Sequence, residues 1–363
     1  MSLACAIVGL PNIGKTSVFN AATGAGAERA SYAFSTVEPN VAEVDVPDER
    51  LEVIHRFVET DKIVPAKVKI VDVPGLAAGA SEGEGMGNKF LGAIKEADAL
   101  MQVVQCFERA ELARESPVDP ESDIEALELE LALADYETVA RNADRVAKKA
   151  RTGDKEAILQ GEVLAKAKSL LEDGVQLRTR PWTKEEREAL RPLFLLTIKP
   201  VLYLANVGDD DFAGQGPYAQ SVAKHAEEVG APWLPMCADV ECELSAMEET
   251  DRAMFMEELG LEGLALPRLL AATYRSLGLQ TYFTAGEKEI KAWTIEKGDT
   301  APIAAGKIHT DFLKGFVRAE VYSVDDLVAY HSEAAIRAGG KLRVEGKTYV
   351  MREGDVCHFL VNR

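Results

Sequence analysis

The segment GLPNIGKT, residues 9–16, constrains this chain more than any other feature. It follows the pattern Gly-x4-Gly-Lys-[Ser/Thr], in which backbone N–H groups curl around phosphate oxygens. An apolar, strand-like run (residues 3–9) leads into it, and a helix-like run (residues 15–22) follows it. Strand, glycine-rich loop and helix in this order are the context in which the pattern binds a nucleoside triphosphate. We therefore expect a P-loop nucleotide-hydrolase domain.

The residue types in this loop predict individual roles. Lys15 supplies a positive charge to the β- and γ-phosphates and is a catalytic candidate, and Thr16 offers a hydroxyl to Mg²⁺. Asn12 either coordinates K⁺ beside the phosphates or only shapes the loop. The residues of this segment expected to contact nucleotide are Asn12, Ile13, Gly14, Lys15, Thr16 and Ser17.

A second motif, Asp72-Val73-Pro74-Gly75, ends the next strand candidate, residues 67–73. Asp72 is expected to hold Mg²⁺ through water, and Gly75 to donate its backbone N–H to the γ-phosphate. Thr36 lies between the two motifs and is either a switch residue that closes on Mg²⁺ or a turn threonine. The glycine-rich run 77–87 is interpreted as a second switch loop.

Base recognition is predicted at Asn206-Val207-Gly208-Asp209, after the strand candidate 199–206. Guanine-specific relatives carry Asn-Lys-x-Asp there, and the carboxylate accepts hydrogen bonds from guanine N1 and N2. Val207 replaces the lysine whereas Asp209 remains, so the motif leaves adenine and guanine open. Leu76, after the second motif, cannot orient water. Hydrolysis should therefore be slow and depend on another group, a partner or a cation.

The pattern along the chain divides it into three parts. Strand candidates at 99–106, 199–206 and 232–238 extend the first two and predict a mainly parallel sheet with helices on both faces. Between them, the capping-box pattern Ser122-x-x-Glu125 and apolar residues at helical spacing predict an inserted helical hairpin.

The second hairpin helix is predicted at 156–171, and a third helix starts at Thr183-x-x-Glu186. This insertion is either a rigid spacer or an arm that docks a partner. After residue 279, short strands, many glycines and one helix near 323–331 predict a small α+β domain. The predicted boundaries are 1–117 with 198–277 for the nucleotide domain, 118–197 for the insertion and 278–363 for the C-terminal domain.

Charge and cysteine content exclude several functions. The net charge of −19 argues against DNA binding and against broad nucleic-acid binding. Residues 278–363 carry twelve basic and twelve acidic residues and could dock on RNA. Five scattered cysteines predict neither disulfides nor zinc. No apolar run of about 18 residues and no export signal is present, so we expect a cytoplasmic protein. The sequence does not fix the oligomeric state, and a monomer is the default expectation.

Several long motifs resemble the YchF subfamily of Obg-like ATPases over essentially the whole chain. The resemblance implies an interrupted G domain, a helical coiled-coil insertion and a C-terminal TGS domain of β-grasp fold. It also implies ATP rather than GTP, association with ribosomes, and a role in translation or stress response. The motifs are LPNIGKTSVFNAAT, FSTVEPN, DVPGLAAGASEGEGMGNKFL, DIEALELELALAD, GKIHTDFLKGFVRAEV and GDVCHFLVNR.

The chain departs from that subfamily at two positions. The base motif usually ends in Glu, and Asp209 makes it more guanine-like. A histidine thought to assist hydrolysis aligns with Arg114, which either stabilises charge on the γ-phosphate or is a solvated surface residue. The alternatives to a ribosome-associated ATPase are a GTPase that acts in ribosome assembly and a nucleotide-gated binding module with little catalysis.

Overall fold

The structure is a computed structural model that describes residues 3–24, 28–29, 40–73, 86–108, 117–151 and 153–362, without the side chains of 28–29 and 86–90. The predicted roles of Thr36, Gly75, Leu76 and Arg114 fall outside these ranges. The chain forms two compact units. The first contains residues Met1–Val44 and Lys69–Leu269, and the second Asp45–Val68 and Leu270–Arg363.

A seven-stranded sheet with the order β2-β3-β5-β1-β6-β7-β8 forms the centre of the first unit. From β5 through β8 all neighbours pair in parallel, and only β2 and β3 pair antiparallel among the registers described. Every residue of β6 and β7 is buried, as expected for parallel strands covered on both faces. The strands are β1 Ala4–Val8, β2 Glu28–Arg29, β3 Asn40–Val46, β5 Ala66–Asp72, β6 Ala99–Cys106, β7 Val201–Val207 and β8 Trp233–Met236.

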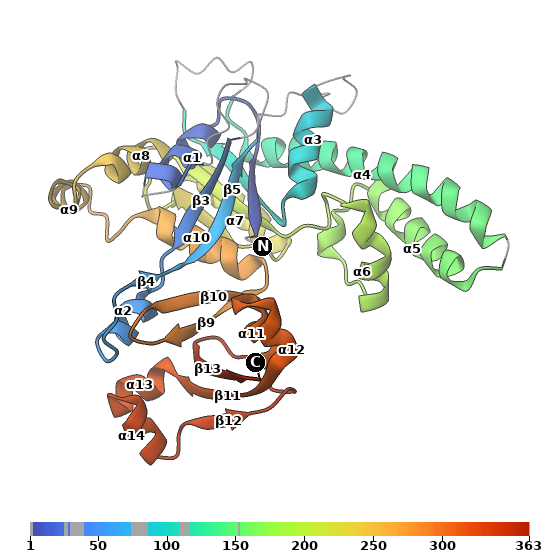
Figure 1. The fold of residues 1–363 in the computed structure, drawn as a ribbon. Helices are drawn as coiled ribbons and strands as arrows, with labels where there is room; N and C mark the ends of the chain where they lie inside the picture. Colours follow the sequence, from blue (N-terminus) through green and yellow to red (C-terminus); the bar gives the residue numbers. More distant parts are fainter. Residues whose placement is uncertain are drawn as a thin grey trace. The chain divides into compact units, whose positions relative to one another are not determined.

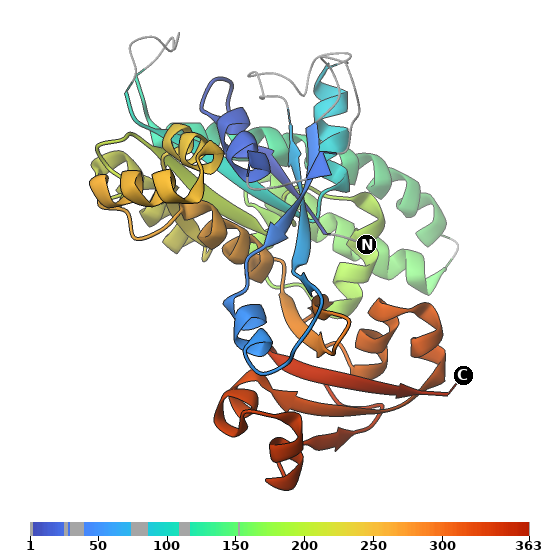
Figure 2. The same cartoon turned by 60° about the vertical axis from the view of Figure 1, so that its left-hand side comes forward.

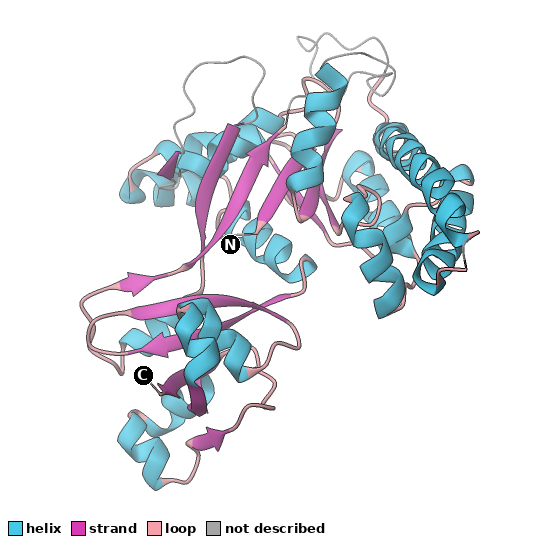
Figure 3. Cartoon of the chain, turned by 45° about the vertical axis from the view of Figure 1, so that its right-hand side comes forward, coloured by secondary structure: helices cyan, strands magenta, loops and turns pink. Residues whose placement is uncertain are grey.

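Helices lie on both sides of this sheet (Figure 3). One core cluster joins three of the helices, α3, α4 and α7, to β1, β6 and β7. The P-loop therefore lies at the end of a strand whose position is fixed by packing. This confirms the predicted α/β class and mainly parallel sheet. The helices outside the insertion are α1 Lys15–Gly24, α3 Met86–Glu96, α7 Pro217–Glu228, α8 Ala238–Ala246, α9 Glu249–Glu258 and α10 Ala265–Ser276.

The insertion is a helical hairpin of α4 (Pro120–Ala150) and α5 (Lys155–Glu172), followed by α6 (Lys184–Leu190) (Figure 1). The predicted N-cap of the first helix is wrong. Asp119, not Ser122, caps α4, and its carboxylate accepts from the Ser122 N–H at 3.2 Å. Proline at the first helical position lacks only an N–H that would be unpaired there, so the helix begins earlier. Two short 3₁₀ turns follow α5 and α6, at Leu177–Thr179 and Arg191–Leu193.

The capping box at the start of α6 is confirmed. The Thr183 Oγ1 accepts from the Glu186 N–H at 3.2 Å, and the Glu186 carboxylate accepts from the Thr183 N–H at 2.7 Å. At the base of the insertion, the buried Asp135 of α4 accepts from both Thr197 N–H and Oγ1 at 2.7 and 2.6 Å. These contacts hold the base of the arm against the segment that leads into β7.

The second unit contains a six-stranded sheet with the order β12-β11-β13-β9-β10-β4. Helices α11 and α12 contact each other, and α11 also contacts β10 and β11. The strands are β4 Ile63–Val64, β9 Leu279–Ala285, β10 Ile290–Glu296, β11 Phe316–Ser323, β12 Arg343–Glu345 and β13 Asp355–Val361, and the helices are α2 Glu49–His55, α11 Ala301–Ile308, α12 Thr310–Gly315, α13 Val324–Tyr330 and α14 Glu333–Ala338.

The expectation of a single helix in the C-terminal part is wrong, because the described residues after 279 form four. The helix near 323–331 is present as α13, but α11, α12 and α14 were missed. Each of these has only six to eight residues, too few to show a 3.6-residue period, and the glycines inside or beside them favoured turns. His309 is the N-cap of α12, where its Nδ1 accepts from the Asp311 N–H at 3.2 Å.

Residues 45–68 belong to the second unit, although the predicted boundaries put them in the nucleotide domain. Strand β4 pairs in parallel with β10, and the Ile290 N–H donates to the Lys62 carbonyl at 2.9 Å. Helix α2 contacts β10 and α13, as Figure 2 shows in blue beside the orange and red elements. A two-residue strand between Lys62 and Pro65 has no alternating pattern, so nothing in the sequence indicates this pairing.

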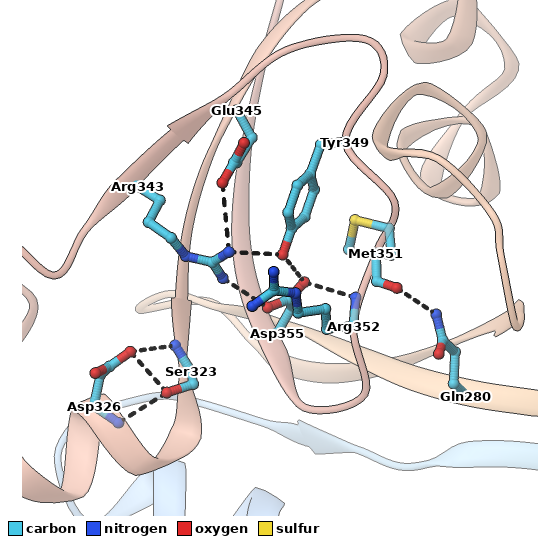
Figure 4. A network of polar contacts seen from close by, with 9 residues as sticks. All are labelled: Gln280, Ser323, Asp326, Arg343, Glu345, Tyr349, Met351, Arg352 and Asp355. Atoms are coloured by element: carbon cyan, nitrogen blue, oxygen red, sulfur yellow. Dashed lines mark hydrogen bonds and ion pairs between the residues drawn. The ribbon is translucent and has the colours of Figure 1, made fainter.

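Asp355 is the centre of a polar network in this unit (Figure 4). It is 2% exposed and accepts from the Tyr349 hydroxyl at 2.8 Å, from the Arg352 N–H at 2.9 Å and from Arg343 Nη2 at 3.1 Å. Arg343 Nη1 also lies 3.4 Å from Glu345. The network joins β12 and the loop that follows it to the start of β13.

We expect Asp355→Ala to lower the free energy of unfolding of the second unit by about 3 kcal/mol. The substitution removes the carboxylate to which Arg343 and the Tyr349 hydroxyl both donate. Hydrogen exchange of the β11 and β13 amides in increasing urea would measure the change. Asp325→Ala is the matched control, since Asp325 is exposed on α13 and should change stability by less than about 0.5 kcal/mol. Equal effects of the two substitutions would show that the network does not stabilise the unit.

Candidate nucleotide-binding site

The P-loop has the backbone geometry that phosphate binding needs. Gly9 and Gly14 adopt positive φ angles of 149° and 94°, and Asn12 adopts a left-handed φ of 61°. Asparagine tolerates this conformation better than most residues because its short polar side chain bonds locally. The angle supports the loop-shaping role of Asn12 and leaves its role as a K⁺ ligand a prediction.

The structure brings Lys15, Thr16 and Asp72 together. Lys15 is 7% exposed and its Nζ donates to the Leu10 carbonyl at 2.5 Å, so the ammonium lies inside the loop. The Thr16 hydroxyl donates to Asp72 Oδ2 at 3.3 Å. Burial raises the pKa of Asp72, an effect opposed by hydrogen bonds from Asn40 and Thr16 and by the charge of Lys15. A hydroxyl beside a carboxylate fits Mg²⁺, which prefers oxygen ligands.

Nucleotide affinity should depend on pH through Lys15. Burial lowers the pKa of Lys15 to about 8, and the nearby Asp72 offsets part of that effect. Because triphosphate needs the ammonium form, affinity should be constant below about pH 8 and fall up to about tenfold per pH unit above it. Calorimetric titration with ATP between pH 7 and 9.5 would measure this.

Lys15→Arg is the control for that titration, because arginine stays protonated over this range. Its affinity, whatever its absolute level, should not change between pH 7 and 9.5. A wild-type affinity that is equally flat would show that Lys15 is already fully charged in the free protein.

Asn206 connects the P-loop to the start of helix α8. Its Nδ2 donates to the Ile13 carbonyl at 2.8 Å, and its Oδ1 accepts from the Ala238 N–H at 3.0 Å. The described bonds of this buried side chain therefore go to backbone groups. Nearby, the Ser17 hydroxyl donates to Asp239 Oδ1 at 3.1 Å. Asp239 was not among the predicted site residues.

A cavity of about 690 Å³ opens at the carboxyl ends of β6, β7 and β8. Ligands of α/β proteins bind at this edge of the sheet, and the volume suits a nucleoside. Val207 and Asp209, which were predicted to recognise the base, are among the residues that line it. Phe107 and Tyr218, which lie after β6 and at the start of α7, were not predicted. The position of Phe107 directly after the parallel strand β6 was an available signal, whereas Tyr218 lies well beyond β7 and had none. The lining residues that carry a carboxylate are Glu108, Asp209, Asp210, Asp211, Asp239 and Glu243.

All five cysteines are free thiols. Cys106 and Cys237 line the cavity, and burial raises the pKa of both, so they are poor nucleophiles in the folded chain. No group of three or more His, Cys, Asp or Glu residues among the described positions could hold a metal ion. In the same ranges, no helix is both long and apolar enough to cross a membrane.

Comparisons with known proteins cover the whole chain. Residues 279–362 match the family model YchF-GTPase_C, described as "Protein of unknown function (DUF933)", and residues 4–142 match one described as "50S ribosome-binding GTPase". Over the full length of both chains, this chain is 47% identical to the "Ribosome-binding ATPase YchF" of Escherichia coli O157:H7 and 45% identical to that of Bacillus subtilis strain 168.

A solved structure gives the same result for the fold. The "Schizosaccharomyces pombe YchF GTPase" superimposes with a TM-score of 0.86 at 36% identity, and the match covers 99% of this chain and 98% of that one. The bacterial relatives are named as ATPases, whereas the Schizosaccharomyces pombe protein is named as a GTPase.

Proposed function

Because the chain belongs to the YchF family of P-loop nucleotide hydrolases, we propose that it is a ribosome-associated ATPase that acts as a slow regulatory switch. The observation that carries the proposal is the grouping of Lys15, Thr16 and Asp72 at a P-loop that Asn206 joins to the wall of a nucleoside-sized cavity. We place the protein in the cytoplasm with its ribosomal partner, and we assign it a role in translation or stress response from the family resemblance.

In this proposal, different described residues contact the phosphates, Mg²⁺ and the base. Lys15 contacts the β- and γ-phosphates, and Thr16 and Asp72 hold Mg²⁺, which supplies charge neutralisation during phosphoryl transfer. Asn206 holds the P-loop against the start of α8, while Val207 and Asp209 contact the base. From sequence alone we assign Thr36 to Mg²⁺, Gly75 to the γ-phosphate and Arg114 to charge stabilisation.

The base is adenine in this proposal because of Val207. Without a lysine, no side-chain stem covers the guanine plane, so the contact that favours guanine in guanine-specific relatives is missing. Asp209 retains the carboxylate that guanine requires, and it is the observation that favours GTP hydrolysis as the second candidate. A direct competition between ATP and GTP for the site distinguishes the ATPase from the GTPase candidate.

The test is a titration of the full chain with a fluorescent ATP analogue, displaced by unlabelled ATP or GTP in Mg²⁺ with K⁺ and then Na⁺. We expect ATP to displace the analogue at least about ten times better, a preference of about 1.4 kcal/mol. Val207→Lys should reduce the preference for ATP over GTP. Tighter binding of GTP by the wild type would replace the ATPase assignment with that of a GTPase.

Ribosome association needs its own measurement. The full chain should co-sediment with purified ribosomes in the presence of a non-hydrolysable ATP analogue. An Arg114→Ala variant, which keeps the Lys15 that binds nucleotide, tests the third candidate, a nucleotide-gated binding module, by its effect in cells. If that variant hydrolyses no ATP and still replaces the wild type in cells, catalysis is dispensable.

A further inference from the structure

Helix α9, Glu249–Glu258, buries none of its residues. Met254 is 68% exposed and Phe255 is 48% exposed, and Leu259 at the C-cap is 37% exposed. Isolated helices shorter than about 12 residues are marginal in water, and most helical stability in proteins comes from packing of an apolar face. A ten-residue helix that leaves large apolar side chains in solvent therefore lacks the contacts that normally stabilise one.

The exposed apolar side chains lie on one side of the helix. At about 100° per residue, Met254, Phe255 and Leu259 fall within an arc of about 140°. Figure 1 shows α9 at the margin of the first unit, beside α8. We call these three side chains, with the carboxylates around them, the α9 patch. Methionine is common at protein-docking surfaces because its flexible side chain adapts to a partner.

The charges of the α9 patch have one sign. Residues 248–262 contain a single basic residue, Arg252. Among the described residues, none forms an ion pair with the six carboxylates of this stretch. Glu257 and Glu258 occupy the last turn, where the helix dipole is already negative and a basic residue would be favourable. The six acidic residues are Glu248, Glu249, Asp251, Glu257, Glu258 and Glu262.

A groove runs along the other side of the same helix. It has a volume of about 420 Å³, and Met256 and Leu261 provide its apolar surface. Glu249, Arg252 and Glu257 line it with charge. The helix thus offers apolar contacts on two sides, with carboxylates between them.

We propose that the α9 patch docks a basic protein segment whose Lys and Arg residues alternate with large apolar side chains. The cations would pair with Glu257 and Glu258 and remove their repulsion from the helix end, while the apolar side chains cover Met254, Phe255 and Leu259. Nucleic acid is excluded as the occupant, because six unpaired carboxylates repel its phosphates. This step rests on the proposed function: since the partner is the ribosome, the segment that docks on the α9 patch belongs to a ribosomal protein and not to ribosomal RNA.

Two variants of the full chain test the proposal. The first, Met254→Ser with Phe255→Ser and Leu259→Ser, removes the apolar contacts. The second, Glu257→Lys with Glu258→Lys, keeps them and reverses the charge at the helix end, where lysine favours the helix. Loss of binding in the second variant therefore cannot come from unfolding of α9. The control is Val344→Ser with Val350→Ser, which changes two exposed apolar residues of the second unit, 59% and 50% exposed.

The probes are purified ribosomes in co-sedimentation and a synthetic amphipathic Lys/Leu helix of about 18 residues in fluorescence anisotropy. For both probes we expect a loss of affinity of at least about tenfold in both variants and none in the control. Unchanged binding in either variant, or cross-linking from position 255 to ribosomal RNA, would overturn the proposal. If the wild type binds the peptide at α9 but does not bind ribosomes, the proposed ribosome association is wrong, whereas the α9 patch is still a docking surface for basic segments.

Discussion

Replacement of Gly14 by alanine is expected to weaken ATP binding at least about 100-fold, equivalent to about 2.7 kcal/mol. Gly14 has a φ of 94°, which an L side chain rarely adopts, and an added Cβ would lie 2.4 Å from Asn206 Nδ2. Asn206 cannot retreat without losing its bonds to the Ile13 carbonyl and the Ala238 N–H. The substitution must therefore distort the loop that surrounds the phosphates.

Gly92→Ala is the matched control for that experiment. Gly92 lies inside α3, and an added Cβ there meets nothing within 4 Å. Alanine has the higher helix propensity, so this change should leave ATP affinity unaltered and stabilise the helix slightly. Calorimetric titration of both variants with ATP measures the difference. A Gly14→Ala protein that binds ATP as tightly as Gly92→Ala would show that the loop has another phosphate-binding conformation.

The second large effect concerns stability. Ile54→Ala should lower the free energy of unfolding of the second unit by about 3 kcal/mol, within the range for removal of a buried isoleucine side chain. Ile54 is completely buried in α2, which contacts β10 and α13. Hydrogen exchange of the β10 and β13 amides should accelerate, whereas the amides of β1 and β6 in the first unit should exchange as before.

The control is Glu52→Ala, an exposed position of the same helix, which should change the exchange rates little. The C-terminal fragment 270–363 should also be less stable than the second unit of the full chain, because it lacks α2, β4 and the Arg50–Glu353 ion pair at 2.6 Å. If Ile54→Ala accelerates exchange only in the first unit, residues 45–68 do not contribute to the C-terminal core.

Long patterned elements could be predicted from sequence. The strand at 99–106 has the predicted bounds, and the hairpin helix predicted at 156–171 extends by one residue at each end. Such runs carry enough apolar residues for the period to appear locally. The short elements could not be predicted, because β4 has two residues and α12 has six. Their conformation depends on neighbours that are distant in sequence.

Part of the candidate site could be predicted in the same way. Lys15, Thr16 and Asp72 belong to motifs whose residue types are dictated by phosphate and Mg²⁺ chemistry, and the structure places the three side chains together. The contacts of Asn206 with the P-loop and the pairing of Ser17 with Asp239 have no sequence pattern. They join residues 193 and 222 positions apart along the chain.

By itself, then, the sequence determined that this protein is a P-loop α/β chain of the YchF type with an inserted helical hairpin, because strand, loop and helix periods and the phosphate motifs are local properties. Only the tertiary structure decided that residues 45–68 complete the C-terminal sheet, that Asn206 holds the P-loop, and that α9 buries nothing. Each of these depends on pairing or burial between distant segments. A single chain written as a sequence does not record which surfaces meet.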